Sequence, residues 1–137
     1  GVVLRYDAPA TPIIATTDGE RLIQAVTNLL SNAAKFSPAG STVSVELRST
    51  DTSFTIRVCD QGPGVPTEFR PRLFDQFSQH GAAAAKDLPG TGLGLAITKG
   101  IAKLLGGDVR LDEDYRQGAA FEIELPLRIA NAIAIAV

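Results

Sequence analysis

Residues 17–36, TDGERLIQAVTNLLSNAAKF, decide the fold because they predict a long amphipathic helix. Thr17 or Asp18 offers an N-cap, and Glu20 stands three residues after Thr17, as in a capping box. We therefore expect a helix from about Asp18 to Phe36. Its apolar residues recur at helical spacing: Leu22, Val26, Leu29 and Ala33.

Segments on both sides of this helix predict β-strands. Before the helix, Val2–Tyr6 and Ile13–Thr16 are short and rich in β-branched residues. After the helix, apolar and polar residues alternate in residues 43–47 and again in residues 54–58. The two alternating stretches predict a β-hairpin.

A long connection and a second helix follow the hairpin. Residues 62–91 are rich in glycine, proline and alanine, so we expect irregular structure there, with one or two helical turns around residues 70–77. A helix is predicted from about Gly92 to Gly106. The resulting order, β-β-α-β-β-loop-α-β-β, is typical of an α/β sandwich with helices on one face of a mixed sheet, and not of a doubly wound parallel fold. Two closing strands complete the order: Val109–Asp112 and Ala120–Leu125.

Length and composition limit the class of protein. The 137 residues suffice for one compact domain, and the net charge of −2 supplies no cationic field for a nucleic-acid partner. The only cysteine, Cys59, and the only histidine, His80, cannot make an internal disulfide or a four-ligand zinc site, which favours a reducing cytoplasm. The chain has no apolar run of about 18 residues that could span a membrane. It has no methionine and begins at Gly1, so we expect a piece of a longer protein, whose membrane anchoring the sequence leaves open.

A polar stripe follows the first predicted helix. Gln24, Asn28 and Asn32 are spaced at i, i+4 and i+8, and Lys35 lies three residues further. Asparagine is unfavourable in a helix interior because its side chain competes for backbone hydrogen bonds. The stripe therefore has two interpretations: neutral oxygen ligands for Mg²⁺ with Lys35 neutralising phosphate, or an ordinary exposed face.

The segment DQGPG, residues 60–64, follows the second strand of the predicted hairpin. A carboxylate at Asp60 can accept a hydrogen bond from an amino group, and Gly62 and Gly64 let a flat ring approach the backbone. The alternative is an ordinary turn. The segment alone does not decide between them.

The segment GTGLGL opens the second predicted helix. Unpaired backbone N–H groups and the positive end of the helix dipole make such a helix start an anion site. The spacing fits neither a P-loop nor a dinucleotide fingerprint, and the alternative is a flexible helix start. The candidate phosphate-binding residues are Gly90, Thr91, Gly92, Leu93, Gly94 and Leu95.

Four segments in order closely resemble the sequence boxes of sensor histidine kinases: NLLSNAAKF, DQGPG, LFDQF and GTGLGL. That family belongs to the GHKL superfamily, which shares its nucleotide fold with gyrase, MutL and one class of heat-shock chaperones. The resemblance covers roughly residues 18–126. It implies the Bergerat ATP-binding fold, an α/β (α+β) two-layer sandwich whose mixed, mostly antiparallel sheet of about five strands packs on about three helices.

The resemblance also implies roles for the polar stripe and the buried carboxylate. By similarity, Asn28 coordinates Mg²⁺, and Asn32 and Lys35 serve the triphosphate of ATP. Asp60 receives the adenine amino group, and Phe36 packs near the base.

Glycines and phenylalanines complete the implied site. Gly62 and Gly64 shape the adenine pocket, and the glycines of GTGLGL contact the phosphates. Phe74 and Phe77 match an aromatic pair that anchors a mobile lid over residues 66–91.

Gln24 favours a kinase over an ATPase. Hydrolytic relatives carry glutamate four positions before the magnesium-binding asparagine, and glutamine cannot accept a proton from water. The phosphoaccepting histidine, which the family places on a dimerisation domain, is absent, and His80 lies in the lid. We expect the chain to bind ATP without autophosphorylating, with that dimerisation domain and a response regulator as partners in two-component signalling.

Two other functions remain as alternatives. A GHKL ATPase or an anti-sigma-type serine kinase would share the fold, and the paired phenylalanines argue against it. A degenerate regulatory module would bind nucleotide without transferring phosphate, and Asn28, Asp60 and GTGLGL argue against that.

Two segments depart from the family pattern. Ala119 and Ala120 stand where relatives often carry a hydroxyl residue near the adenine site. We assign residues 1–128 to the catalytic domain and residues 129–137 to a tail. The apolar tail could form an added strand, an interface, or a linker or remnant of a longer chain, and we favour the last.

Overall fold

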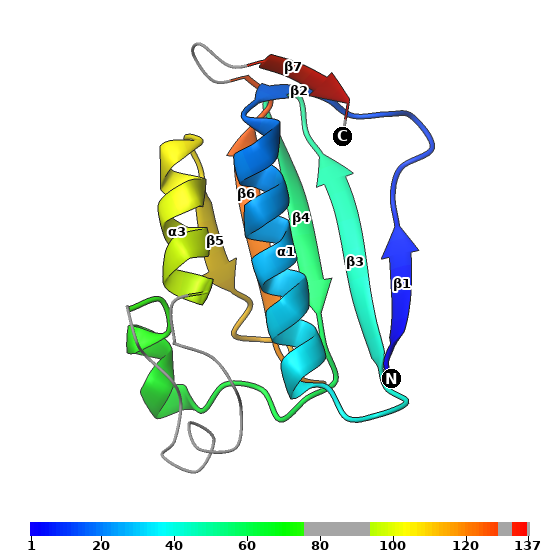
Figure 1. The fold of residues 1–137 in the computed structure, drawn as a ribbon, viewed down its shortest axis with the longest axis vertical. Helices are drawn as coiled ribbons and strands as arrows, with labels where there is room; N and C mark the ends of the chain where they lie inside the picture. The colour runs from blue at the N-terminus through cyan, green and yellow to red at the C-terminus, as the bar shows by residue number, and fades with distance from the viewer. Residues whose placement is uncertain (76–93, 129–132, 137) are drawn as a thin grey trace.

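A five-stranded mixed sheet forms one layer of the protein (Figure 1). The computed structural model describes residues 1–75, 94–128 and 133–136. One edge strand runs parallel to its neighbour, and the other pairs are antiparallel, which confirms the expected mixed sheet. The strands, in spatial order, are β1 (Val3–Asp7), β3 (Thr42–Ser49), β4 (Ser53–Cys59), β6 (Ala120–Pro126) and β5 (Asp108–Leu111).

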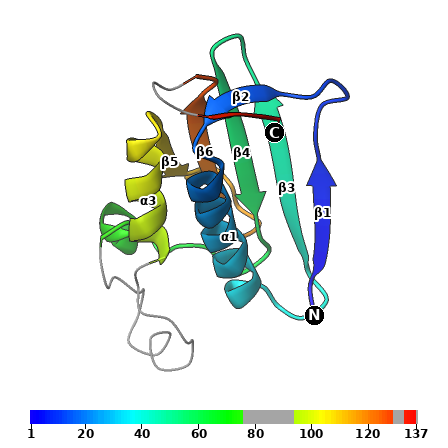
Figure 2. The ribbon, with the colours of Figure 1, turned by 45° about the horizontal axis from the view of Figure 1, so that its top comes forward.

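Within the described residues, two helices cover one face of this sheet. Figures 1 and 2 show α1 (Gly19–Phe36) lying over the middle of the sheet, with α3 (Gly94–Leu104) beside it over the β5 edge. A short 3-10 helix, η1 (Thr67–Arg72), follows β4 and begins earlier than the helical turns expected around residues 70–77. The two-layer sandwich inferred from the order of elements is therefore confirmed. None of the helices in the described part is both long and apolar enough to cross a membrane.

Local interactions explain where α1 begins and ends. Asp18 is the N-cap, since its Oδ1 accepts a hydrogen bond from the backbone N of Arg21 at 3.2 Å. At the other end, the hydroxyl of Ser37 donates to the backbone oxygen of Ala33, and Pro38 follows. Thr17, the alternative cap, lies in a strand instead.

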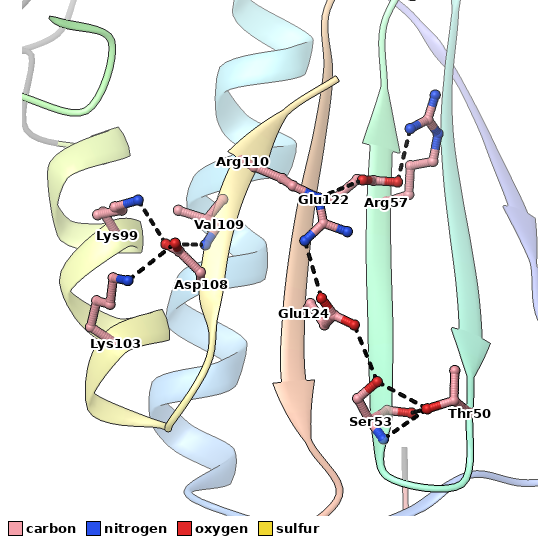
Figure 3. A network of polar contacts seen from close by, with 10 residues as sticks. All are labelled: Thr50, Ser53, Arg57, Lys99, Lys103, Asp108, Val109, Arg110, Glu122 and Glu124. Atoms are coloured by element: carbon pink, nitrogen blue, oxygen red, sulfur yellow. Dashed lines mark hydrogen bonds and ion pairs between the residues drawn. The ribbon is translucent and has the colours of Figure 1, made fainter. Parts of the chain in front are cut away.

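The core lies between the sheet and the helices. Alternate residues of β3, β4 and β6 are buried, so one face of the sheet is apolar and packs on the helices. Phe54 on β4 is fully buried, and Leu29 on α1 is almost so. The opposite face carries charged residues, several of which pair with one another (Figure 3).

A second, two-stranded sheet lies at one end of the molecule. It consists of β2 (Ile14–Thr17), which leads into α1, and β7 (Ile133–Ala136), paired antiparallel. Among the alternatives left open for the tail, the backbone of residues 133–136 thus forms the added strand, because β2 otherwise presents an unpaired edge. The division of the chain at residue 128 stays a prediction.

Candidate functional site

Asp60 is a buried carboxylate at the end of β4, with 3% of its surface exposed. Its Oδ1 accepts hydrogen bonds from the backbone nitrogens of Gly62 and Ala119, each at 2.9 Å. Its own backbone nitrogen donates to the oxygen of Ala119, also at 2.9 Å. Within residues 1–75 and 94–128, no donor contacts the second oxygen, Oδ2. The carboxylate is thus fixed through Oδ1, and Oδ2 remains available to accept a hydrogen bond.

Glycines allow three segments to pack around this carboxylate. A Cβ at Gly62 would lie 2.5 Å from the backbone oxygen of Phe36, the last residue of α1. A Cβ at Gly118 would overlap the backbone oxygen of Asp60. Gly64 has a φ of +78°, a left-handed conformation that favours glycine. Gly62 therefore packs closely beside Asp60 and Phe36, and Gly64 packs against the backbone of Gly118. Their role in an adenine pocket stays a prediction.

The end of α1 adjoins the Asp60 loop, and the polar stripe extends away from this junction. Asn28 and Asn32 are half-buried, whereas Gln24 and Lys35 are exposed. The amide nitrogen of Asn28 is buried and has no hydrogen-bond partner among the described residues. A buried polar group without a partner is rare in proteins, so this amide is suited to binding a ligand.

Asn28 is also the residue that the sequence predicts to hold a metal ion. No cluster of three or more His, Cys, Asp or Glu residues that could bind a metal occurs in the described part of the chain. Mg²⁺ bound to nucleotides takes few protein ligands, because phosphates and water fill most of its octahedral shell. An amide can turn its oxygen toward a cation by rotation about its last torsion. A single asparagine ligand is therefore compatible with a magnesium ion that is already bound to a triphosphate.

Phe74 lies within the predicted lid and packs against the sheet. Its ring meets Phe121 of β6 edge-on, with the centroids 6.1 Å apart, and the Nζ of Lys99 lies 5.2 Å from the Phe74 centroid. Phe74 is half-buried and adjoins the core. Anchoring by packing thus has a structural basis at Phe74, while Phe77 lies outside the described residues.

Part of the predicted phosphate-binding segment can be located. Gly94 is exposed at the first described residue of α3, and Leu95 is half-buried against the core. The remaining predicted site residues fall outside the described ranges: Gly90, Thr91, Gly92 and Leu93. His80 and the part of the predicted lid after residue 75 also lie outside them.

Sequence reasoning missed several residues that surround Asp60. The hydroxyl of Tyr115 donates to the backbone oxygen of Asp60 at 3.1 Å. Gln61 ties the same loop to β3, because its Oε1 accepts from the backbone nitrogen of Thr42 at 2.7 Å. No local pattern marks these contacts. Of these residues, only Ala119 was expected near the site, because the family resemblance placed it close to the adenine.

Comparison with known proteins identifies close similarity to sensor kinases. A model of the family described as histidine kinase-, DNA gyrase B-, and HSP90-like ATPase matches residues 17–129. The sensor histidine kinase RcsC of Escherichia coli (strain K12) is 39% identical over 119 residues, which cover 87% of this chain and 12% of RcsC. The chain thus spans only a small part of this curated relative.

Solved structures agree with the sequence comparison. The mycobacterial sensor histidine kinase MprB superposes with a TM-score of 0.78 and 35% identity, covering 93% of this chain and 83% of that chain. ShkA, solved at full length in complex with AMPPNP, gives a TM-score of 0.78 and 34% identity, covering 96% of this chain and 27% of that one. Both similarities extend over nearly all of the chain.

Proposed function

Since this chain belongs to the histidine kinase-, DNA gyrase B-, and HSP90-like ATPase family, we propose that it binds Mg-ATP and supplies the γ-phosphoryl group to a histidine. The chain corresponds to the ATPase-like catalytic domain of sensor histidine kinases. In the proposal, the acceptor histidine belongs to a separate dimerisation domain. A response regulator then receives the phosphoryl group, as in two-component signalling.

The buried carboxylate of Asp60 is the observation that carries this proposal. Adenine presents an exocyclic amino group, and a rigid carboxylate oxygen without a protein donor is a matching acceptor. Gly62 and Gly64 leave room beside the carboxylate for a flat ring. The relative ShkA, solved with the adenine nucleotide AMPPNP, supports a base of this kind in the site.

The polar stripe of α1 is suited to the phosphate end of the nucleotide. Asn28 lies two helical turns before Phe36, about 12 Å along the helix axis at 1.5 Å per residue. A nucleotide that starts at Asp60 and extends along α1 brings its phosphates toward Asn28, Asn32 and Lys35. Asn28 would hold Mg²⁺, which neutralises charge on the phosphates when bound.

Transfer to histidine requires positioning more than acid–base chemistry. A neutral imidazole nitrogen attacks the γ-phosphorus while the bond to the bridging oxygen breaks, giving phosphohistidine and ADP. Gln24 is exposed on the stripe and cannot take a proton from water, so the site favours transfer over hydrolysis. The one histidine of the chain, His80, lies in the predicted lid. We expect the isolated chain to bind ATP without phosphorylating itself.

The first test compares ATP and inosine triphosphate (ITP) in the wild type and in Asp60→Asn. ITP carries an oxygen in place of the amino group, so wild-type Asp60 should favour ATP. Hydrogen bonds to charged groups contribute about 1.5–3 kcal/mol, so we expect Asp60→Asn to lose at least about tenfold in ATP affinity and most of the preference over ITP. Calorimetric titration with and without Mg²⁺ measures the ATP affinity and the preference for ATP over ITP.

The matched control is Asp51→Asn, because Asp51 is exposed in the β3–β4 turn, at the opposite end of β4 from Asp60. This variant should bind both nucleotides as the wild type does. An Asp60→Asn protein that keeps wild-type affinity for ATP and the same preference over ITP would show that Asp60 does not receive the base. Failure of the wild type to bind ATP would instead contradict the proposed function itself.

A further inference from the structure

We propose that Tyr115 is a positioning residue for base recognition, because its hydroxyl fixes the backbone of Asp60 and so sets the direction of the carboxylate. This inference rests on the proposed function of Asp60 as the acceptor of the adenine amino group. Tyr115 itself does not contact the base in this proposal. It acts through Asp60.

The contact joins two segments that are distant in the sequence. Tyr115 lies in the connection between β5 and β6, and its hydroxyl meets the Asp60 backbone oxygen at 3.1 Å. Asp60 is almost fully buried, so loss of this donor leaves a carbonyl without its hydrogen bond in a place that water reaches poorly. The backbone of Asp60 would then relax, and the carboxylate would move with it.

The guanidinium of Arg57 lies over the tyrosine ring. Its guanidinium carbon lies 5.6 Å from the centroid of the Tyr115 ring. Nη1 of the same side chain pairs with Asp112 and with Glu122, each at 2.9 Å. Arg57 is thus held by two carboxylates, and Figure 3 shows its link to Glu122 across the strands.

The charges in this cluster favour a persistent arrangement. Burial opposes ionisation of Arg57, but hydrogen bonds to Glu122 and Asp112 outweigh it and raise the pKa of Arg57. The backbone hydrogen bond from Asp114 and the side-chain hydrogen bond from Arg57 lower the pKa of Asp112. Burial raises the pKa of Tyr115, so its hydroxyl stays protonated and remains a donor near neutral pH.

The turn that carries Tyr115 is itself tied to the sheet. The backbone nitrogen of Asp112 donates to Ala120 at 2.8 Å, and the nitrogen of Tyr115 donates to Asp112 at 3.3 Å. The side chain of Asp112 also accepts from the nitrogen of Asp114 at 3.0 Å. A rigid chain of contacts therefore runs from β4 and β6 through Tyr115 to the carbonyl of Asp60.

The decisive measurement is the ratio of ITP to ATP dissociation constants in Tyr115→Phe, which removes only the hydroxyl. Loss of a neutral hydrogen bond changes an equilibrium constant about 3- to 10-fold, and we expect the ratio to fall by that factor. General loosening of the fold would weaken the binding of ATP and of ITP by the same factor, and would leave the ratio unchanged. The matched control is Tyr6→Phe, since Tyr6 is the other tyrosine of the chain and is 66% exposed.

Two further variants make the test complete. Arg57→Lys keeps the charge but removes the planar guanidinium that lies over the Tyr115 ring. The ratio should therefore fall in this variant as well, which keeps the test open even if Tyr115→Phe folds poorly. In the Asp60→Asn background, Tyr115→Phe should have no further effect on the ratio, because both act through one carboxylate.

The outcomes separate the two proposals. A ratio that falls in Asp60→Asn but stays at the wild-type value in Tyr115→Phe and Arg57→Lys overturns the positioning role alone. A ratio that no variant changes overturns the assignment of Asp60, and the role of Tyr115 with it. A fall in Tyr115→Phe that persists in the Asp60→Asn background also contradicts the inference, since Tyr115 would then act by another route.

Discussion

Two glycines, Gly118 and Gly100, show how much a single missing side chain matters at the residue scale. A Cβ at Gly118 would overlap the backbone oxygen of Asp60 and lie 2.6 Å from its Oδ1. A Cβ at Gly100, exposed on α3, would meet nothing within 4 Å. The same substitution therefore has opposite expected effects at the two positions.

Gly118→Ala should destabilise the protein and weaken ATP binding. The atom it meets is backbone, which cannot turn away as a side chain can, so Asp60 must shift. Overpacking of this kind costs about 1–3 kcal/mol of unfolding free energy. Urea denaturation measures the stability, and calorimetric titration measures the ATP affinity.

Gly100→Ala serves as the control for Gly118→Ala. Alanine has a higher helix propensity than glycine, so this variant should gain roughly 0.5–1 kcal/mol and bind ATP normally. If Gly118→Ala proved as stable as the wild type, with unchanged ATP affinity, the close packing around Asp60 would be disproved.

At the scale of elements, the junction between α3 and β5 is held by a turn and by charges. Gly106 has a φ of +91°, and the nitrogen of Gly107 donates to the oxygen of Ala102 at 2.8 Å, so α3 ends sharply. Asp108 then accepts from Lys99 at 2.7 Å and from Lys103 at 3.1 Å (Figure 3). One carboxylate thus links the helix to the start of the strand.

This junction predicts a pH-dependent stability. Burial opposes the charge of Asp108, but hydrogen bonds from Lys99 and Lys103 outweigh it and lower its pKa to about 2. A carboxyl with a lowered pKa in the folded state stabilises the protein above its unfolded pKa of about 3.9, and that stabilisation is lost as the pH falls toward about 2. The side chain is 43% exposed, so solvent screens the pairs.

Asp108→Asn should lower the unfolding free energy by up to about 1 kcal/mol at pH 7, because exposed ion pairs contribute little more. The difference from the wild type should remain at pH 5 and shrink between about pH 4 and pH 2. Urea unfolding across this range gives the profile. Asp51→Asn, whose carboxyl is exposed in a turn, should show no such change, and a pH-independent difference for Asp108→Asn would refute the ion-pair explanation.

At the scale of the whole molecule, stability depends on the apolar interface between the sheet and the helices. Among the residues that the structure describes, Phe54 is the largest fully buried side chain, and it lies on the central strand β4. Tyr6, on the edge strand β1, is 66% exposed. The two aromatic residues therefore test the core and the surface of one sheet.

Phe54→Ala should lower the unfolding free energy by about 3–5 kcal/mol, since it removes buried contacts and leaves a cavity between the layers. Tyr6→Ala should change it by no more than about 0.5 kcal/mol. Chemical denaturation followed by circular dichroism measures both. Similar losses in the two variants would contradict the two-layer arrangement of the core.

Local patterns in the sequence predicted much of this fold and part of the site. The spacing of apolar residues and a cap at Asp18 predicted α1, because a helix places every third or fourth side chain on one face. Alternation of apolar and polar residues predicted β3 and β4. Asp60 and its neighbouring glycines became candidate site residues through the resemblance of four short segments to the boxes of histidine kinases. These features depend on residues close together in the chain.

Only the tertiary structure decided which residues hold Asp60 in place and which structure residues 133–136 of the tail adopt. Tyr115 and Ala119 lie 55 and 59 residues from Asp60, and they reach it only because β4 pairs with β6 in one particular register. The tail forms a strand only because β2, at the other end of the sequence, offers it an unpaired edge. Local spacing in a sequence encodes which face of an element is apolar, whereas contacts between distant segments depend on register, and a shift of one residue would turn every side chain to the other face.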